Sequence, residues 1–348
     1  MCALTPYLIF GLSVLIIIKI INKICCFWCK SKVYLVGKTA IVTGGASGIG
    51  FQIVSALASK GCRVIVADIA NLEQAVEALK KTTHNPQIIG NNCKNRFPLK
   101  KQNLSSISGL KVDLESFKSV REFAHQILAS ESRLDILVCN AGTGDHMIRR
   151  ITAEGLERIM QINYFSHFLL THLLLDLLKK SAPSRITFTS SVIAYISDIK
   201  VDKLLPDPDY YESFWSKVTT GTYGGSKLCM AAAAILFGEK LKGSGVTANA
   251  DLPYCVRTPI FWKSIKNDRN YLAALTLLAI QLYGKSAEEG AQTTIHLAHS
   301  DEVKDLTGNV FLDGMIFPRP RQITEEFCTK LWNYSVEYTQ LQPHEVKC

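Results

Sequence analysis

A tyrosine and a lysine one helical turn apart are the residues of this sequence best suited to acid–base chemistry. Tyr223 and Lys227 stand four positions apart, so on a helix their side chains share one face. A phenol has an ordinary pKa of about 10, and a neighbouring ammonium group favours its ionised form. The spacing therefore predicts that Lys227 lowers the pKa of Tyr223 toward neutrality and makes it a usable acid or base.

Two other polar residues could complete the same site. Ser191 follows the β-branched run Arg185–Thr189, so its hydroxyl would stand at the end of a strand, where it could stabilise charge developing on a substrate oxygen. Asn163 lies within the long helical pattern Leu156–Lys180. Each residue alone also fits a structural role, as a strand-end serine or a helix asparagine.

A glycine-rich segment near residue 45 is typical of phosphate binding. Thr43–Gly50 reads T-G-G-A-S-G-I-G, after one β-branched run and before a helical pattern. Glycines allow a tight turn and a close backbone approach, so a pyrophosphate can meet free N–H groups at the helix N-terminus. The segment predicts a dinucleotide site. Its expected contact residues are Gly44, Ser47, Gly48, Ile49 and Gly50.

An acidic residue at the end of the next predicted strand bears on the choice of cofactor. Asp68 lies 18 positions beyond Gly50. Its carboxylate can accept hydrogen bonds from the adenosine ribose and would repel a 2′-phosphate, and neither Ile69 nor Ser47 offers a compensating base. NAD is therefore predicted, with NADP as the alternative. A helix-capping aspartate without cofactor contact is the structural alternative.

In their order these motifs resemble those of the short-chain dehydrogenase/reductase family, and the match runs from Lys38 to about Pro318. The resemblance implies an oxidoreductase that moves hydride between a nicotinamide cofactor and an alcohol or carbonyl. The matching segments are Thr43–Gly50 for the family's T-G-x-x-x-G-x-G, Asn140-Ala141-Gly142 for N-A-G, Ser191 for its catalytic serine and Tyr223–Lys227 for Y-x-x-x-K.

The resemblance also implies roles for single residues. Lys227 would hold the nicotinamide ribose, Asn163 would support a water-linked proton path to Lys227, and Thr258 would contact the carboxamide. Asp113 and Asn140 would line the cofactor site. A homodimer is compatible with the family.

One branch of the family is especially similar. The long gap between Ser191 and Tyr223, the apolar amino terminus and Phe165–Thr171 resemble the retinol dehydrogenases. That branch acts on lipophilic alcohols and aldehydes, so a retinoid-, steroid- or polyisoprenoid-like substrate is expected.

One departure from the family keeps other functions open. Pro253-Tyr254 stands where the family has P-G, and glycine permits backbone conformations that tyrosine resists. It motivates a second hypothesis, a membrane-tethered nucleotide-binding scaffold with little turnover. The intact set of Ser191, Tyr223 and Lys227 favours the enzyme, with an NADP-preferring carbonyl reductase as the alternative within that class.

The elements that would position these residues alternate between strand and helix patterns, which is typical of a parallel sheet covered on both faces. We predict an α/β fold with a Rossmann-type, doubly wound parallel sheet, forming a single domain over residues 38–320 and followed by a tail, 321–348. The expected strands are Thr39–Val42, Arg63–Ala67, Leu134–Cys139, Arg185–Thr189, Val246–Ala250 and Asn309–Leu312, and the expected helices Ile49–Lys60, Ser116–Ser130, Leu156–Lys180 and Tyr223–Lys242.

Two stretches interrupt this alternation. Asn91–Gly109 is polar and without periodicity, which indicates an exposed insertion or an unspliced segment. Tyr271–Tyr283 is strongly apolar and is expected to form a helix over the substrate cleft, in contact with the bilayer if the domain lies against it.

The amino terminus has the composition of a membrane anchor. Leu4–Ile18 is almost wholly apolar, slightly short of the ~20 residues that span a bilayer unless Lys19 snorkels toward the headgroups. The net charge of the chain is +9, and residues 1–40 contain five lysines and no acid, all on the carboxyl side of the run. The positive-inside rule then places the catalytic domain in the cytosol.

We predict an N-terminal membrane helix within residues 1–30, contacting membrane lipid, with the endoplasmic reticulum as the expected membrane. A buried core helix is the alternative, and the absence of a basic n-region argues against a cleaved signal peptide. No basic stripe interleaved with aromatic residues is present, so nucleic acid is not an expected partner.

Cysteine and histidine usage predicts neither disulfides nor a metal site. The eleven cysteines are odd in number and irregularly spaced, which fits a reducing compartment. Cys26-Phe27-Trp28-Cys29 reads C-x-x-C but follows the apolar run, so juxtamembrane thiols, with S-acylation as a minor alternative, are the expectation. His146, His167 and His172 form no ligand set with other residues, and we interpret them as ordinary helix or loop residues.

Overall fold

A single mixed sheet organises the molecule in a computed structural model that describes residues 26–69, 72–83, 106–144, 150–201, 221–257 and 281–348. The strand order is β3-β2-β1-β4-β5-β6-β7-β8, and all neighbours are parallel except β7 and β8. This order confirms the predicted Rossmann-type sheet. The strands are β1 (Thr39–Thr43), β2 (Arg63–Asp68), β3 (Ile107–Lys111), β4 (Ile136–Cys139), β5 (Ser184–Thr189), β6 (Val246–Leu252), β7 (Val310–Leu312) and β8 (Met315–Phe317).

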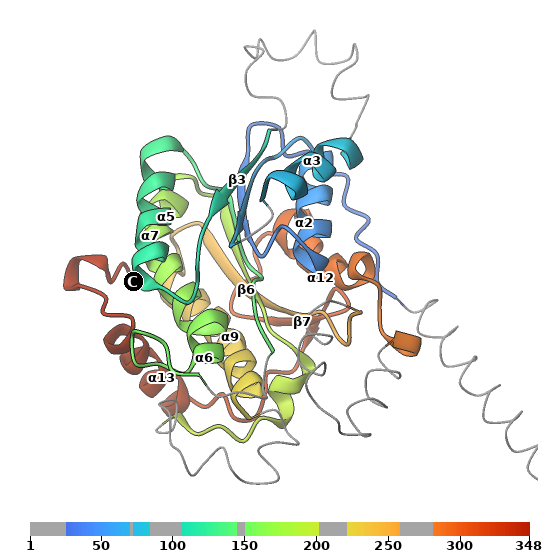
Figure 1. The fold of residues 1–348 in the computed structure, drawn as a ribbon. Coiled ribbons are helices and arrows are strands. Elements are labelled where there is room, and N and C mark those ends of the chain that lie inside the picture. The colour runs from blue at the N-terminus through green and yellow to red at the C-terminus, as the bar shows by residue number, and fades with distance from the viewer. Residues whose placement is uncertain (1–25, 70–71, 84–105, 145–149, 202–220, 258–280) are drawn as a thin grey trace, which may run out of the picture.

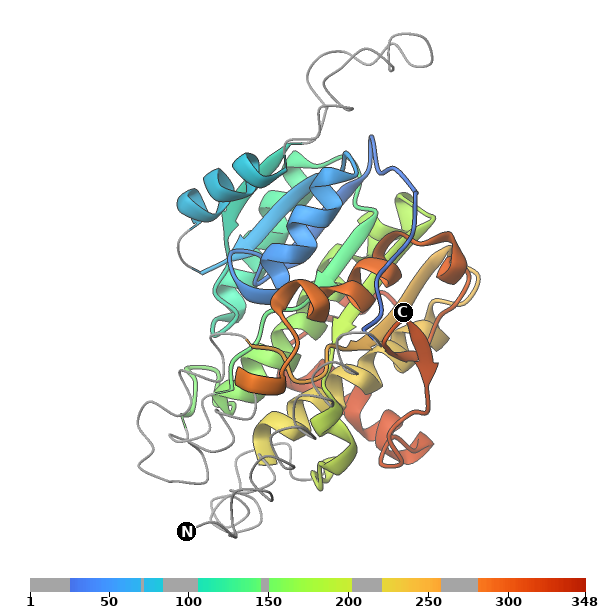
Figure 2. The same ribbon diagram turned by 90° about the vertical axis from the view of Figure 1, so that its right-hand side faces the viewer.

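Helices cover both faces of the sheet (Figures 1 and 2). The central strands are buried throughout, as β1 and β4 show, because a parallel strand with helices above and below reads as a continuous apolar run. The two largest core clusters lie one on each face. One face carries α2 (Gly48–Ser59), α3 (Leu72–Thr82) and α12 (Ala287–His299), and the other α5 (Phe117–Ser130), α7 (Ser166–Lys180) and α9 (Gly221–Lys240).

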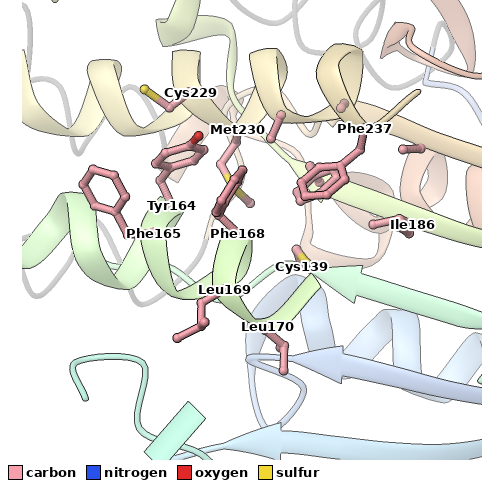
Figure 3. Packing of buried hydrophobic residues seen from close by; sticks show 14 of the residues in the cluster. Cys139, Tyr164, Phe165, Phe168, Leu169, Leu170, Ile186, Cys229, Met230 and Phe237 are labelled. Carbon is pink, nitrogen blue, oxygen red and sulfur yellow. The ribbon is translucent and has the colours of Figure 1, made fainter. Parts of the chain in front are cut away.

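Part of the larger core cluster lies between α7 and α9. Phe168 on α7 and Phe237 on α9 have ring centroids 5.5 Å apart, and Figure 3 shows both rings with Tyr164 and Met230 in the space between the two helices. Phe168 and Phe237 are each no more than 1% exposed. This packing fixes α9, which carries Tyr223 and Lys227, against the helix that follows Asn163.

The segment that leads into α7 departs from ordinary helical geometry. A short helix, α6 (Arg158–Met160), runs into a π-helical turn, η1 (Gln161–Phe165), and then directly into α7. Single π turns inside helices are frequent at functional sites, and this one contains Asn163. The sequence pattern Leu156–Lys180 therefore predicted the helical segment but not its local distortion.

The carboxyl-terminal residues belong to the folded domain, so their description as a tail is wrong. Helix α13 (Glu325–Tyr338) places Trp332 with its ring centroid 5.2 Å from that of Phe168, and the Tyr164 hydroxyl lies 2.7 Å from that of Ser335. Arg121 also pairs with Glu345. The helix covers an apolar surface of α7 and α9 that would otherwise face water.

Two other predicted boundaries need correction. The expected insertion was to end at Gly109, but Ile107–Gly109 form the first part of β3, whose Gly109 is the register partner of Val66. The expected anchor was to extend to residue 30, but Phe27 packs its ring 5.2 Å from that of His296 and Cys29 N–H donates to Gln292 Oε1 at 3.1 Å. Residues 26–30 therefore lie on the catalytic domain.

Three predicted segments, and the single residues His146 and Thr258, fall wholly or partly on residues that the structure does not describe. The segments are the apolar run Leu4–Ile18, residues 91–105 of the insertion and residues 271–280 of the apolar stretch. Within the described ranges, no helix is both long and apolar enough to cross a bilayer.

Candidate active site

The carboxyl ends of the central strands meet at a cavity of about 390 Å³, the place where open α/β sheets bind their ligands. The strands bring together residues that are far apart in the sequence. Of the predicted site residues, those lining the cavity are Gly44, Ser47, Gly48, Ile49, Asp68, Asp113, Asn140, Ser191, Tyr223 and Lys227.

The glycine loop between β1 and α2 has the backbone shape that a phosphate needs. Gly44 and Gly48 both have left-handed φ values, +67° and +55°. A Cβ on Gly44 would come within 2.9 Å of the Ala141 Cα, and one on Gly50 within 2.2 Å of the Gly44 carbonyl oxygen. Ser47 precedes α2 in an extended conformation without a side-chain capping bond. The loop therefore fits a dinucleotide pyrophosphate, and Gly50 contributes by close packing without lining the cavity.

Asp68 stands at the end of β2, beside this loop. Its Oδ2 accepts a hydrogen bond of 3.1 Å from the Ala46 N–H, and Oδ1 accepts one of 2.8 Å from the Ile69 N–H. The carboxylate thus holds the glycine loop and also lines the cavity. Ile69 is 53% exposed and offers no positive charge.

Tyr223 and Ser191 meet through their hydroxyl groups. Burial raises the pKa of Tyr223 to about 12, and the hydrogen bond with Ser191 opposes that rise. The Lys227 ammonium lies 5.8 Å from the Tyr223 ring centroid. The prediction that the pKa of Tyr223 is lowered toward neutrality is wrong for this structure, because burial raises it.

The backbone of β5 holds the Lys227 side chain in place by a hydrogen bond. Its side chain is 3% exposed, and Nζ donates to the Thr189 carbonyl at 2.9 Å. Burial lowers the pKa of Lys227 to about 8, and the charge of Asp251 opposes that fall. The lysine therefore remains mostly protonated at neutral pH, close to a point where small changes in its surroundings alter its charge.

Asn163 joins the loop after β4 to helix α9. Its Oδ1 accepts from Thr143 N–H at 2.7 Å, and its Nδ2 donates to the Thr143 carbonyl and to Ser226 Oγ, both at 3.0 Å. The residue is fully buried and does not line the cavity. Its side chain fixes Ser226, the neighbour of Lys227, relative to the loop.

His167, which the sequence analysis interpreted as an ordinary helix residue, connects two parts of the site. Nδ1 lies 3.0 Å from the Asn163 carbonyl, which can only accept, so Nδ1 carries the proton. Nε2 then accepts from the Thr43 hydroxyl at 2.9 Å. Burial lowers the pKa of His167 to about 4, so the ring is neutral. The i, i+4 spacing from Asn163 is the signal that could have found it.

The Thr43 hydroxyl completes that connection. Its Oγ1 accepts from the N–H groups of Asn140 and Ala141 at 2.9 and 3.0 Å, and the Asn140 amide donates to the Thr43 carbonyl at 2.9 Å. One chain of hydrogen bonds therefore runs from the N-A-G segment through Thr43 and His167 to the backbone of Asn163.

The remaining predicted residues have simpler placements. Asp113 lines the cavity and accepts from the Glu115 N–H at 2.9 Å, a local turn that leads into α5. Thr258 lies outside the described residues. No group of three histidine, cysteine or acidic side chains in the described ranges is arranged to hold a metal ion.

Tyr254 adopts a left-handed backbone conformation, which glycine adopts more readily than tyrosine. Its φ is +68°, in the left-handed region where a bulky side chain is strained. The ring lines the cavity and is 51% exposed, and Lys285 Nζ lies 5.6 Å from its centroid. The departure at Pro253-Tyr254 therefore places a bulky side chain in a strained backbone conformation at the edge of the cavity.

We expect Tyr254→Gly to raise the stability of the protein relative to Tyr254→Ala by about 1 kcal/mol, because alanine loses the ring but keeps a Cβ in the left-handed region. Both variants lack the contact with Lys285, so the difference isolates the backbone. Urea unfolding of the two variants measures it, and an alanine variant at least as stable as the glycine variant would show that Tyr254 is unstrained.

Fold and cavity together define an NAD(P)-dependent oxidoreductase acting on CH–OH groups, and comparison with known proteins gives the family. A family model described as "short chain dehydrogenase" matches residues 38–200. Retinol dehydrogenase 12 from Mus musculus is 32% identical over 317 residues, 90% of each chain, and human retinol dehydrogenase 13 is 34% identical over 92% of this chain and 89% of its own. The chain belongs to the short-chain dehydrogenase/reductase family, in the retinol dehydrogenase branch.

Solved structures support the same fold. An uncharacterized protein from Mycobacterium paratuberculosis superposes with a TM-score of 0.62 at 22% identity, covering 88% of this chain and 95% of its own. Pseudomonas aeruginosa RhlG, in an active-site complex with NADP, gives a TM-score of 0.56 at 24% identity, covering 82% and 97%.

Proposed function

We propose that this protein transfers hydride between NAD and a lipophilic alcohol or its carbonyl product, with Tyr223 as the acid or base. The observation that carries the proposal is that Tyr223, Ser191 and Lys227 line the same cavity as the glycine loop. When bound, the nicotinamide supplies the hydride acceptor or donor. Gly44, Gly48 and Asp68 would hold its adenosine and pyrophosphate part.

The residues of the chain then handle the proton. A phenol whose pKa is raised to about 12 keeps its proton at neutral pH, so Tyr223 can donate it to a carbonyl oxygen during reduction. In the opposite direction it must accept the alcohol proton, which the Ser191 hydrogen bond and the Lys227 charge favour. Ser191 also offers a donor to the substrate oxygen as charge develops there.

The substrate class is supported by the relatives, which are named retinol dehydrogenases. A membrane anchor at Leu4–Ile18 would bring the cavity close to substrates dissolved in lipid. The alternative of a low-turnover scaffold loses its motivation, because Tyr254 adopts the left-handed conformation that it was expected to resist. NADP remains the alternative cofactor.

A panel of alcohols tests this function. We expect the purified full-length protein in detergent to reduce NAD with a retinoid, a steroid or a polyisoprenoid alcohol, and with kcat/KM at least about tenfold above that for ethanol, because burying a long apolar chain adds binding free energy that ethanol lacks. Turnover of ethanol as fast as the long alcohols would refute the substrate class, and no turnover by any of them would refute the enzyme.

We also propose that the chain is anchored in a membrane, with the catalytic domain in the cytosol and the endoplasmic reticulum as the membrane. The lysines that follow the apolar run support this orientation. Because Phe27 and Cys29 contact α12, an informative truncation ends before them.

We expect deletion of residues 1–25 to release an intact domain into the supernatant of an alkaline carbonate wash, while the full-length protein stays in the pellet. The melting temperature of the truncated domain should match that of the full-length protein. A deletion of residues 1–30 serves as the comparison, and it should lower the melting temperature because it removes Phe27. Full-length protein in the supernatant would contradict the anchor.

A further inference from the structure

A fully buried aspartate lies behind the strand that holds Lys227. Asp251 on β6 has no exposed surface, although aspartate is almost never fully buried unless it is paired. Its Oδ2 accepts a hydrogen bond of 2.8 Å from the Thr294 hydroxyl on α12, and Oδ1 has no partner of standard geometry among the described residues. An asparagine could accept the same bond from Thr294, so that bond does not explain a charged side chain.

Strand pairing places Asp251 beside the residue that binds Lys227. In the parallel ladder Asp251 is the register partner of Thr189, and neighbouring strands lie about 4.8 Å apart. The Thr189 carbonyl accepts from Lys227 Nζ at 2.9 Å. Lys227 reaches this point from α9, on one face of the sheet, and Asp251 turns toward α12 on the other. The ammonium and the carboxylate therefore approach the sheet from opposite faces, and both adjoin Thr189 of β5.

Asp251 and Lys227 each oppose the effect of burial on the pKa of the other. Burial raises the pKa of Asp251 to about 6, and hydrogen bonding and the Lys227 charge oppose the rise. Burial lowers the pKa of Lys227 to about 8, and the Asp251 charge opposes the fall. At a pH between about 6 and about 8, Asp251 and Lys227 are therefore both ionised. Opposite charges that are buried together offset part of the free energy that each loses by leaving water.

Among the described residues, Lys227 is the one charge that acts on the Asp251 carboxylate, although α12 also carries Glu288, Glu289, His296 and His299, and β5 carries Arg185. The neighbouring side chains are neutral at neutral pH apart from the lysine. They are Thr189 on β5, Thr294 on α12, Phe311 on β7 and Lys227 on α9.

We propose that Asp251 is a positioning residue, whose carboxylate keeps the Lys227 ammonium charged while Lys227 holds the cofactor and favours the ionised form of Tyr223. The inference rests on the part that the proposed function gives to Lys227. The hydroxyl groups of Thr294 and Thr189 both act on Asp251 by hydrogen bonding, but an asparagine could accept from them equally well. The charge of Lys227 gives a reason for an aspartate at this buried position.

The test is the pH dependence of cofactor binding to the full-length protein in detergent. In the wild type, the affinity for NADH should fall as pH rises through the pKa of Lys227, and this fall is the alkaline limb of the binding profile. Asp251→Asn removes the negative charge at nearly constant volume, so this fall should move about one pH unit lower. At a pH between the alkaline limb of the variant and that of the wild type, NADH binding to the variant should be weaker by up to about tenfold. At a pH below both alkaline limbs, the variant and the wild type should bind NADH with the same affinity. The alkaline limb of kcat/KM should shift by the same amount.

Thr294→Val is the matched control. It removes a hydrogen bond from the same carboxylate but leaves the charge, so it should keep the alkaline limb of the wild type even if its melting temperature falls. Asp251→Val should shift the limb in the same direction as Asp251→Asn, and it replaces that variant if the latter folds poorly.

The possible outcomes separate this inference from the proposed function. If NADH binds and the limb is unmoved in the Asp251 variants, the carboxylate does not act on Lys227, and the proposed function stands. If the limb moves equally in Thr294→Val, the effect is structural and the inference is wrong. If the wild type binds no cofactor at any pH, both are wrong.

Discussion

Replacing Tyr223 by phenylalanine is expected to lower kcat for alcohol oxidation by about 10²–10⁴-fold, the range that a well-placed general acid or base contributes. The variant loses one hydroxyl, the group that meets Ser191 and would exchange a proton with the substrate oxygen. The aromatic ring and its contact with Lys227 remain. NADH affinity should therefore change little, and the loss should lie in kcat. Steady-state kinetics with a long-chain alcohol and a binding titration measure the two quantities.

Tyr34→Phe is the control for this substitution. Tyr34 is 61% exposed and has Lys60 over its ring, so the loss of its hydroxyl should leave kcat within error of the wild type. A Tyr223→Phe variant with more than about a tenth of the wild-type kcat would remove Tyr223 from the proton-transfer step, because general acid–base assistance rarely contributes so little.

The raised pKa of Tyr223 also gives a direction to the pH dependence. Oxidation needs the phenol to be ionised, and a pKa raised to about 12 leaves only a small ionised fraction at neutral pH. kcat for oxidation should therefore increase with pH for as long as Lys227 keeps its proton. Reduction uses the protonated phenol and should show no such rise.

Exchanging Asp68 for serine together with Ile69 for arginine is expected to reverse the cofactor preference. The wild type should favour NAD by about tenfold to a thousandfold, because NADP would bring a phosphate of about −2 charge against the Asp68 carboxylate. The double variant removes that repulsion and supplies a guanidinium, which binds phosphate well. The measurement is kcat/KM for NAD and NADP at one ionic strength.

Ile69→Arg alone is the matched control for the cofactor experiment. It adds the same guanidinium but keeps the carboxylate, so it should shift the preference by less than the double variant does. Asp68 also accepts the Ala46 N–H, so the double variant should bind both cofactors somewhat more weakly than the wild type binds NAD. A wild type that already prefers NADP would contradict the placement of the ribose beside Asp68.

The sheet and most of the site residues could be predicted because their signals are local. β1 and the glycine loop are contiguous, and Tyr223 and Lys227 share one helix, so spacing alone brings them together. The carboxyl ends of parallel strands lie at one edge of a sheet, which places Asp68, Asn140 and Ser191 at the same cavity.

The parts that could not be predicted depend on contacts between distant segments. The role of His167 requires Thr43 on another element, and the buried charge of Asp251 is visible only once β5 and β6 are paired. The pKa of Tyr223 was predicted in the wrong direction, because spacing shows the nearby lysine but not the degree of burial. The folded state of α13 likewise depends on Phe168, far earlier in the chain.

The central claim is that hydride passes directly between the carbinol carbon of a lipophilic alcohol and the bound nicotinamide, with Tyr223 taking the proton. The most direct measurement uses a long-chain primary alcohol deuterated at its carbinol carbon, incubated with NAD and the full-length protein in detergent, followed by mass spectrometry of the cofactor. The account predicts reduced cofactor carrying one deuterium, formed by the wild type and by Tyr34→Phe but not at a comparable rate by Tyr223→Phe. Reduced cofactor without deuterium, or equal label with Tyr223→Phe, would contradict it.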